Sequence, residues 1–409
     1  MSESTKKTPI RDGLIILGIT LVLFGILEGA LRLIFPARAA ADNSVAYMHH
    51  PDYLVTLRPN VEKTFVREGI NGGDTIVWRS NSMGMRGPEP AANPPFRVVV
   101  YGDSNIQARF STDENTYTGQ LQRMLRDSIA GLEVINAGII GAGPDQYFLR
   151  FQETVDQLQP DLVIFNVFTA NDYGDLVKNR LFEVDSVSGA LRRSRHPVTV
   201  DDQLADKPFP QNLADDLMIV RAVRKLLSGR SSSNDPEKVM ETIAQLEADE
   251  YRVYRDDLPR SYSHFGDHYE LGLATDPDSA PSRLRKQLMS GVLDAARNFS
   301  TERNIPFVVV VQPTVTDLTT NVELTYEHLE KYPAYRPENL TETMMDICRD
   351  ENLACVDLFP IYQKLGASEL FFKGTDKHWN DRGQEVAARS TVDYLNRYVF
   401  RADTVSVDQ

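Results

Sequence analysis

Short apolar runs, each followed by apolar residues at helical spacing, recur along the chain after residue 95. The first run, residues 96–101 (FRVVVY), is almost entirely apolar, which is typical of a strand buried on both faces. Further strands are expected at residues 133–136, 161–168, 305–311 and 354–359, and helices at residues 117–129, 146–158, 283–299, 341–349 and 382–398. Because strands that alternate with helices require crossover connections, the pattern predicts an α/β fold, a three-layer sandwich around a central parallel sheet. Ligands of such sheets bind beyond the carboxyl ends of the strands.

Two other stretches do not follow this alternation. Residues 42–95 are rich in Pro, Asn and Gly, which predicts irregular structure that packs on the rest of the chain or forms a small extra layer. Between about residues 181 and 281 strand signals are few, which indicates an insertion or cap on the sheet. Substrate specificity would be determined in such a segment.

The N-terminal part has its own pattern. Residues 13–35 form an apolar stretch of 23 residues whose only charges are Glu28 and Arg32, long enough to span a bilayer as a helix. Glu28 and Arg32 are one helical turn apart, so they can pair or reach toward the interface. Basic residues at positions 6, 7 and 11 precede the stretch and place the N-terminus in the cytoplasm. We therefore expect a single-pass membrane protein whose main part is periplasmic or extracellular.

A cleaved signal peptide is the alternative interpretation of this stretch. Small residues at positions 37–41 offer a processing site. The apolar stretch is longer than the roughly 7–15 residues of a signal peptide, which favours an uncleaved anchor. Both interpretations place the main part of the chain outside the cytoplasm.

Composition and charge exclude several classes of protein. The chain of 409 residues is 42% apolar and 25% charged, so it is not wholly disordered, collagen-like or a coiled coil. Its 58 acidic and 44 basic residues give a net charge of −14, so no nucleic-acid partner is expected. Two cysteines, Cys348 and Cys355, are too few for a disulfide scaffold or a cysteine zinc site. Outside the cytoplasm they either form a disulfide or remain two buried thiols.

Chemically reactive residues follow three of the expected strands and precede the last helix. They are Ser104, in Gly-Asp-Ser-Asn after the first strand, Gly138 after the second, Asn171 and Asp172 after the third, and Asp376 and His378 before the closing helix. Acyl transfer to a serine requires a base, an acid that orients the base, and donors that hold the oxyanion. Gly-Asp-Ser-Asn is also the composition of an ordinary turn, so the candidate site depends on the whole set.

No metal or organic cofactor is expected. His264 and His268 are four residues apart, but a glycine lies between them and no glutamate base accompanies them. We interpret them as exposed loop residues.

The candidate set resembles the SGNH, or GDSL-type, hydrolase superfamily over about residues 81–398. Residues 102–105 (GDSN) are similar to its nucleophile block, and residues 81–87 (NSMGMRG) look like a segment of membrane-anchored bacterial members. The resemblance implies that Ser104 is the nucleophile and His378 the base. It also implies an oxyanion hole formed by the backbone N–H groups of Ser104 and Gly138 and the side chain of Asn171. Asp103 and Asp172 would be supporting acids.

The last block departs from the usual family pattern. A single residue separates Asp376 from His378, whereas the usual spacing is two, and Thr375 stands at the usual acid position. With Trp379 after the histidine, this block resembles the Asp-x-His-Trp variant of envelope polysaccharide acetylation proteins. Asp376 is the expected orienting acid. In the rival interpretation Asp376 caps the final helix and another acid, such as Asp172, lies near the site.

The resemblance implies a carboxylic ester hydrolase of the SGNH type. The expected function is a membrane-anchored, exported serine esterase that removes O-acyl groups, acetyl in the first place, from an acylated carbohydrate or lipid of the cell envelope. The first alternative is an O-acetyltransferase that acts on an envelope polysaccharide. The second alternative is a non-catalytic envelope binding protein on the same scaffold. The expected partners are the substrate, the membrane and envelope polysaccharide machinery.

The expected domain organisation follows from these interpretations. It comprises a cytoplasmic tail (1–12), a transmembrane anchor (13–35), a lead-in segment (36–95), an SGNH hydrolase domain (96–400) with its insertion, and a C-terminal tail (401–409).

Overall fold

The computed structural model describes residues 9–34, 46–67, 69–185, 187–195, 197, 219, 271–318, 333–373 and 378–400. The chain divides into two compact units, Met1–Ser44 with Lys207–Asn234, and Val45–Asp206 with Asp235–Gln409. The sheet and the candidate site residues belong to the second unit.

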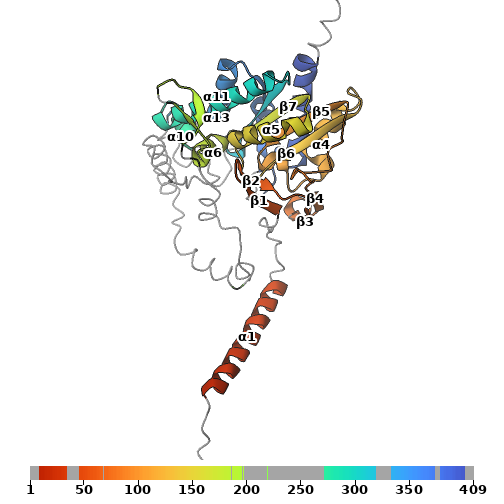
Figure 1. The fold of residues 1–409 in the computed structure, drawn as a ribbon, viewed down its shortest axis with the longest axis vertical. Coiled ribbons are helices and arrows are strands. Elements are labelled where there is room, and N and C mark those ends of the chain that lie inside the picture. Colours follow the sequence, from red (N-terminus) through yellow and green to blue (C-terminus); the bar gives the residue numbers. More distant parts are fainter. Residues whose placement is uncertain are drawn as a thin grey trace, which may run out of the picture. The chain divides into compact units, whose positions relative to one another are not determined.

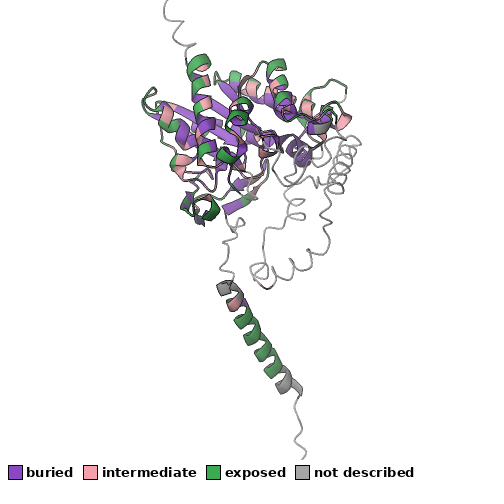
Figure 2. Cartoon of the chain, turned by 180° about the vertical axis from the view of Figure 1, so that it is seen from behind, coloured by how far each residue is buried: buried purple, intermediate pink, exposed green. Residues whose placement is uncertain are grey.

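Helix α1 (Pro9–Ile34) makes up most of the described part of the first unit. The large apolar side chains in its middle are exposed (Figure 2). Glu28 is buried and accepts a hydrogen bond from the backbone N–H of Ile219 at 3.1 Å. Across the residues that the structure describes, no helix combines the length and the apolar character needed to cross a membrane. The span expected at residues 13–35 is therefore not shown.

A five-stranded parallel sheet forms the centre of the second unit (Figure 1). Its strands lie in the order β11–β10–β7–β5–β6, and all neighbours are parallel. They are β5 (Phe96–Gly102), β6 (Leu132–Gly138), β7 (Leu162–Phe168), β10 (Phe307–Gln312) and β11 (Ala354–Asp357). The expected α/β fold with a central parallel sheet is thus confirmed.

Side chains that alternate along each strand divide the core into two halves. In β5, Val99 and Tyr101 belong to one apolar cluster, and Val98 and Val100 to the other. The first cluster is covered by α5 (Pro144–Leu158), α6 (Asp172–Asn179), α10 (Leu271–Thr275), α11 (Ala280–Thr301) and α13 (Asn339–Asp350). The second is covered by α4 (Tyr117–Leu125), α14 (Phe359–Leu365), α15 (Ala367–Leu370), α16 (Asp381–Tyr394) and the π-helical turn η5 (Leu395–Val399), with α12 (Val315–Leu318) at its edge. Because helices cover both faces, the strands are apolar on both sides.

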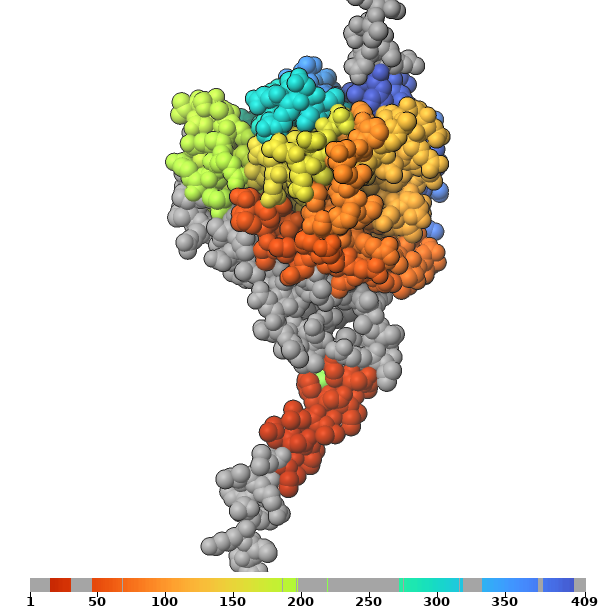
Figure 3. All heavy atoms as spheres, turned by 45° about the vertical axis from the view of Figure 1, so that its right-hand side comes forward, coloured from red at the N-terminus to blue at the C-terminus, as the bar shows by residue number. Residues whose placement is uncertain are grey.

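The lead-in segment is more regular than its composition indicates. It forms two antiparallel pairs, β1 (Tyr47–His50) with β2 (Leu54–Leu57) and β3 (Glu62–Val66) with β4 (Thr75–Arg79), and the short turn η1 (Gly69–Asn71). In Figure 3 these residues, coloured orange-red, cover the surface beside α5. The Tyr53 hydroxyl donates to Glu153 of α5 at 2.7 Å. The lead-in thus forms two small sheets of its own and contacts α5, whereas the sequence predicted irregular structure.

Apart from Ile219, the expected insertion at about residues 181–281 is described only toward its two ends. Strand β8 (Phe182–Val184) pairs with β9 (Leu191–Arg193), and α10 precedes α11. His264 and His268 lie outside the described residues. The role of this segment as a cap stays a prediction.

Cys348 and Cys355 form a disulfide with an Sγ–Sγ distance of 2.08 Å. The bond joins α13 to β11 across a sequence separation of seven residues. Of the two states that the sequence left open, the structure has the disulfide.

Candidate active site

Ser104 begins the short helix α3 (Ser104–Gln107), directly after β5 ends. Asp103 is the N-cap residue, and its Oδ1 accepts a hydrogen bond from the Asn105 N–H at 2.8 Å. As the first helical residue, Ser104 has a backbone N–H with no acceptor inside the helix. The side chain of Ser104 is half-buried. The local fold therefore places a hydroxyl and an N–H group at the carboxyl edge of the sheet, where ligands of such sheets bind.

His378 meets Ser104 from the other end of the second unit's sequence. The distance between His378 Nε2 and Ser104 Oγ is 2.7 Å, which is a hydrogen bond. The Phe372 N–H donates to the His378 carbonyl at 3.0 Å, and Phe371 forms a bridge with Trp379. These backbone contacts fix the histidine. An imidazole nitrogen bonded to a serine hydroxyl is the arrangement that activates serine as a nucleophile.

Asp376 lies outside the described residues, so its contact with His378 stays a prediction. The rival role, capping of α16, belongs to Asn380 instead. The Asn380 Oδ1 accepts hydrogen bonds from the N–H groups of Arg382 and Gly383, both at 2.9 Å. The helix that follows His378 therefore has its N-terminal cap without Asp376.

Asp172 is fully buried at the start of α6. Its Oδ2 accepts a hydrogen bond from the Phe168 N–H at 2.9 Å, whereas its Oδ1 has no hydrogen-bond partner. Burial, and then the charges of Asp103 and Asp175, raise the pKa of the Asp172 carboxyl well above its ordinary value. These contacts indicate a carboxyl that closes the turn after β7, next to Asn171.

Two of the three expected oxyanion donors have acceptors within the protein. The Gly138 N–H donates to Asn136 Oδ1 at 3.1 Å, and Asn171 Nδ2 donates to Asp175 Oδ2 at 2.7 Å. The Asn171 amide has a second N–H, and its Oδ1 is buried without a partner. An oxyanion at this site would share or replace these internal acceptors.

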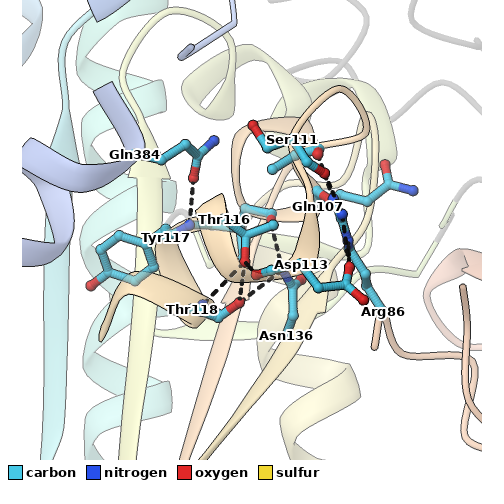
Figure 4. Close-up of polar contacts among 12 residues, drawn as sticks. Arg86, Gln107, Ser111, Asp113, Thr116, Tyr117, Thr118, Asn136 and Gln384 are labelled. Carbon is cyan, nitrogen blue, oxygen red and sulfur yellow. Dashed lines mark hydrogen bonds and ion pairs between the residues drawn. The ribbon is translucent and has the colours of Figure 1, made fainter. Parts of the chain in front are cut away.

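Helix α3 lies directly against the end of β6. A Cβ atom on Gly138 would lie 2.4 Å from the backbone nitrogen of Gln107, so a larger residue does not fit. Asn136 Nδ2 donates to the Ile106 carbonyl at 2.6 Å and to Thr118 Oγ1 at 3.2 Å (Figure 4). Asn136 therefore joins β6, the serine helix and α4.

Arg86 of the lead-in holds the chain that leaves α3. Its side chain is almost fully buried and pairs with Asp113, with 2.9 Å between Nη2 and Oδ1 (Figure 4). The guanidinium also donates to the carbonyls of Gln107, Ala108 and Ser111. Burial lowers the pKa of Arg86, and the charge of Asp113 opposes this shift. A buried cation needs such acceptors, so Arg86 fixes the loop after the serine helix.

Two more buried carboxyls lie on α5 and α6. Asp175 pairs with Lys178 at 3.3 Å, and Asp145 Oδ1 accepts a hydrogen bond from Asn179 Nδ2 at 3.2 Å. Burial raises the pKa of Asp145 to about 7. Over the described ranges, no group of three or more His, Cys, Asp or Glu side chains could hold a metal ion.

Sequence reasoning did not single out Asn105, Asn136, Asp175 or Arg86. A signal existed for Asn136, which is a polar residue between the apolar residues Ile135 and Ala137 near the end of an expected strand. Arg86 lies in the segment that resembles membrane-anchored relatives, but its spacing does not indicate burial. Asp175 lies outside the motif that contains Asp172, the other acid of its helix, so its contact with Asn171 appears only in the fold.

No family model matches the sequence, and no curated protein matches it. Similar solved structures include the acetyl xylan esterase AlAXEase, 15% identical with a TM-score of 0.35 and coverage of 73% of this chain and 100% of that chain. A putative lipolytic protein of the G-D-S-L family from Desulfitobacterium hafniense is 11% identical, with a TM-score of 0.33 and coverage of 73% and 99%. A single-residue variant of the acetyl xylan esterase Axe2 from Geobacillus stearothermophilus is 12% identical, with a TM-score of 0.36 and coverage of 74% and 96%.

Proposed function

We propose that the protein is a serine esterase of the SGNH type that removes O-acyl groups, acetyl in the first place, from a carbohydrate or lipid of the cell envelope. The observation that carries the proposal is the 2.7 Å hydrogen bond between Ser104 Oγ and His378 Nε2 at the carboxyl end of β5. The two residues are 274 positions apart in the sequence. A histidine that is hydrogen-bonded to a serine at the carboxyl edge of the sheet can take the serine proton, which acyl transfer requires.

In the proposed reaction His378 Nε2 takes the proton of Ser104 Oγ while Oγ bonds to the ester carbonyl carbon. The resulting oxyanion is held by the Ser104 and Gly138 N–H groups and the Asn171 amide. The imidazolium then gives its proton to the alcohol oxygen as the ester C–O bond breaks and the acyl-enzyme forms. Water repeats the two steps, which releases the acid and restores the serine. Asp376 holds the second imidazole nitrogen in this proposal.

A location outside the cytoplasm belongs to the proposal as well, with residues 13–35 as the anchor. In the sequence, the 23-residue length of this stretch, with only two charges, and the basic residues before it support an anchored, exported protein. The disulfide between Cys348 and Cys355 also supports it, since disulfides persist in oxidising compartments. Alkaline extraction of membranes from cells that express the full-length chain tests the anchor. Release of the protein into the supernatant would refute it.

Active-site labelling of the full-length protein tests the chemistry. A serine-reactive phosphonate should label the peptide that contains Ser104, and hydrolysis of aryl acetates should disappear in Ser104→Ala. Ser188→Ala is the matched control, because Ser188 lies exposed in the turn between β8 and β9. Full activity in Ser104→Ala would refute the assignment. Absence of both labelling and hydrolysis in the wild-type protein would favour a non-catalytic binding protein.

The fate of the acyl-enzyme distinguishes a hydrolase from an O-acetyltransferase. After rapid acylation by an aryl acetate, a hydrolase releases acetate to water at a rate that does not depend on added glycan. A transferase releases it slowly until an unacetylated polysaccharide is added, and the acetyl group then appears on the glycan. Acetylated glycan as the main product would replace the proposed activity by that of a transferase.

A further inference from the structure

We propose that Asn105 is a positioning residue that sets the distance between Ser104 Oγ and His378 Nε2. This inference rests on the proposed function of the two reactive side chains. Asn105 follows Ser104 in the sequence, and Trp379 follows His378. The Trp379 N–H donates to Asn105 Oδ1 at 3.1 Å, so the two segments are joined one residue beyond the reacting pair on each side.

The Asn105 amide has a defined orientation. Its Nδ2 donates to Asp103 Oδ2 at 3.3 Å, and a carboxylate oxygen accepts hydrogen bonds but does not donate them. The oxygen Oδ1 is therefore the atom that faces Trp379. Asp103 is held in turn by the Asn105 backbone N–H, at 2.8 Å from its Oδ1. Because Asn105 is only 1% exposed, water does not compete for these groups.

A second contact joins Asn105 to the segment that carries the histidine. The Asn105 carbonyl accepts a hydrogen bond from Gln384 Nε2 at 2.9 Å. The other end of this amide, Gln384 Oε1, accepts the Tyr117 N–H at 2.7 Å (Figure 4). Trp379 and Gln384 both follow His378, so the chain after the histidine is attached to Asn105 at two points.

Leucine branches at the same carbon as asparagine and has the same number of side-chain heavy atoms, but it has no acceptor. Asn105→Leu leaves the buried Trp379 N–H without a partner, and the histidine segment relieves this by moving away from the serine turn. A displacement of about 1 Å at a reacting pair lowers turnover on the order of a hundredfold. Asn105 does not contact substrate in this scheme, so the KM is expected to change little.

The experiment compares Asn105→Leu with Thr391→Val in the full-length protein. Thr391 is a buried residue of α16 whose Oγ1 accepts a hydrogen bond from the Tyr117 hydroxyl at 2.9 Å. Its replacement removes a buried hydrogen bond of α16 about three turns beyond the start of that helix. We measure kcat and KM for an aryl acetate and the urea midpoint of unfolding. If Asn105→Leu does not fold, Asn105→Ala removes the same acceptor.

The expected result is a loss of kcat by about tenfold or more in Asn105→Leu, with KM within about twofold of the wild type. Thr391→Val should keep the wild-type kcat even though it loses as much stability as Asn105→Leu. Wild-type kcat in Asn105→Leu would overturn the inference. So would equal kcat losses in the two variants, because they would follow from stability alone.

A spectroscopic measurement separates this inference from the proposed function. In protein labelled with 15N in histidine, the Nε2 signal of His378 reports its hydrogen bond to Ser104. The signal is assigned by its loss in His378→Gln. Ser104→Ala gives the chemical shift of the imidazole without this hydrogen bond, which is the unbonded position. Asn105→Leu is expected to shift the signal to the unbonded position, and Thr391→Val to leave it unchanged. A wild-type protein without Ser104-dependent hydrolysis would refute the proposed function and leave this test intact. An unchanged signal in Asn105→Leu would overturn the positioning role.

Discussion

Replacement of Asp145 by asparagine is expected to stabilise the protein above neutral pH and to change little in acid. Asp145 is the second residue of α5 and is 1% exposed. Its Oδ1 accepts hydrogen bonds from the Gln146 N–H at 2.9 Å and from Asn179 Nδ2 at 3.2 Å, whereas its Oδ2 has no hydrogen-bond partner. Because one oxygen accepts both hydrogen bonds, the oxygen of an asparagine can accept them equally well.

The magnitude of the effect follows from the pKa of this carboxyl. Burial raises the pKa of Asp145 from 3.8 to about 7, against the opposing effect of the hydrogen bonds from Asn179 and Gln146. Above about pH 4 the unfolded chain loses this proton while the folded protein keeps it, so the free energy of unfolding falls with rising pH until about pH 7. At about 1.4 kcal/mol per pKa unit, the total is at most about 4 kcal/mol. Water that enters around the buried charge reduces this free energy.

Urea unfolding of the full-length protein and of Asp145→Asn, from about pH 5 to about pH 8, tests this reasoning. The stability of the variant relative to the wild type should increase with pH up to about pH 7 and stay constant above it. Asp127→Asn, which replaces an exposed carboxyl in the turn after α4, is measured beside it as the control. A pH-independent difference for Asp145→Asn would show that the folded protein does not hold the extra proton. A variant less stable than the wild type at the highest pH would show that the carboxylate is favourably bound.

The remaining predictions concern the disulfide and the oxyanion donors. Replacing both Cys348 and Cys355 by serine should lower the free energy of unfolding by about 2.5 kcal/mol, from the loop-entropy relation for so short a loop, and equal urea midpoints would contradict it. Asn171→Ala should reduce kcat about 100- to 1000-fold for aryl acetates, and an effect on KM alone would make Asn171 a binding residue. Gly138→Ala should slow phosphonate labelling and lower stability by about 1–3 kcal/mol, because the added methyl group meets the backbone of Gln107. Wild-type labelling would show that α3 adapts without loss.

The sheet could be predicted from the sequence because its strands are buried on both faces. Residues 96–101 were expected as a strand, and β5 spans Phe96–Gly102. Ser104 was identifiable because it follows this strand directly, and the end of a parallel strand is a fixed place in the fold. The pairing of Ser104 with His378 is what the resemblance to the SGNH superfamily implies, and the structure brings the two side chains together.

The lead-in could not be predicted because its strands are short and only partly buried. In β4, Ile76 and Trp78 are buried while the residues between and beside them are exposed, and the surrounding turn residues conceal so weak an alternation. The hydrogen bond from the Gly138 N–H to Asn136 Oδ1 also could not be predicted from the sequence. It depends on how α3 lies against β6, which is set by tertiary contacts.

The distance between Ser104 Oγ and His378 Nε2 depends on the hydrogen bonds around α3 more than on the apolar core. Arg86 from the lead-in, Asn136 from β6 and Gln384 from α16 each bind a backbone group in or next to this helix. Hydrophobic contacts are not directional, whereas a hydrogen bond fixes the separation of two atoms within a few tenths of an ångström. Because the three side chains come from separate segments, they hold the serine helix against the sheet and the C-terminal segment together. Loss of one of them should therefore disturb the contact between Ser104 and His378 before it disturbs the sheet.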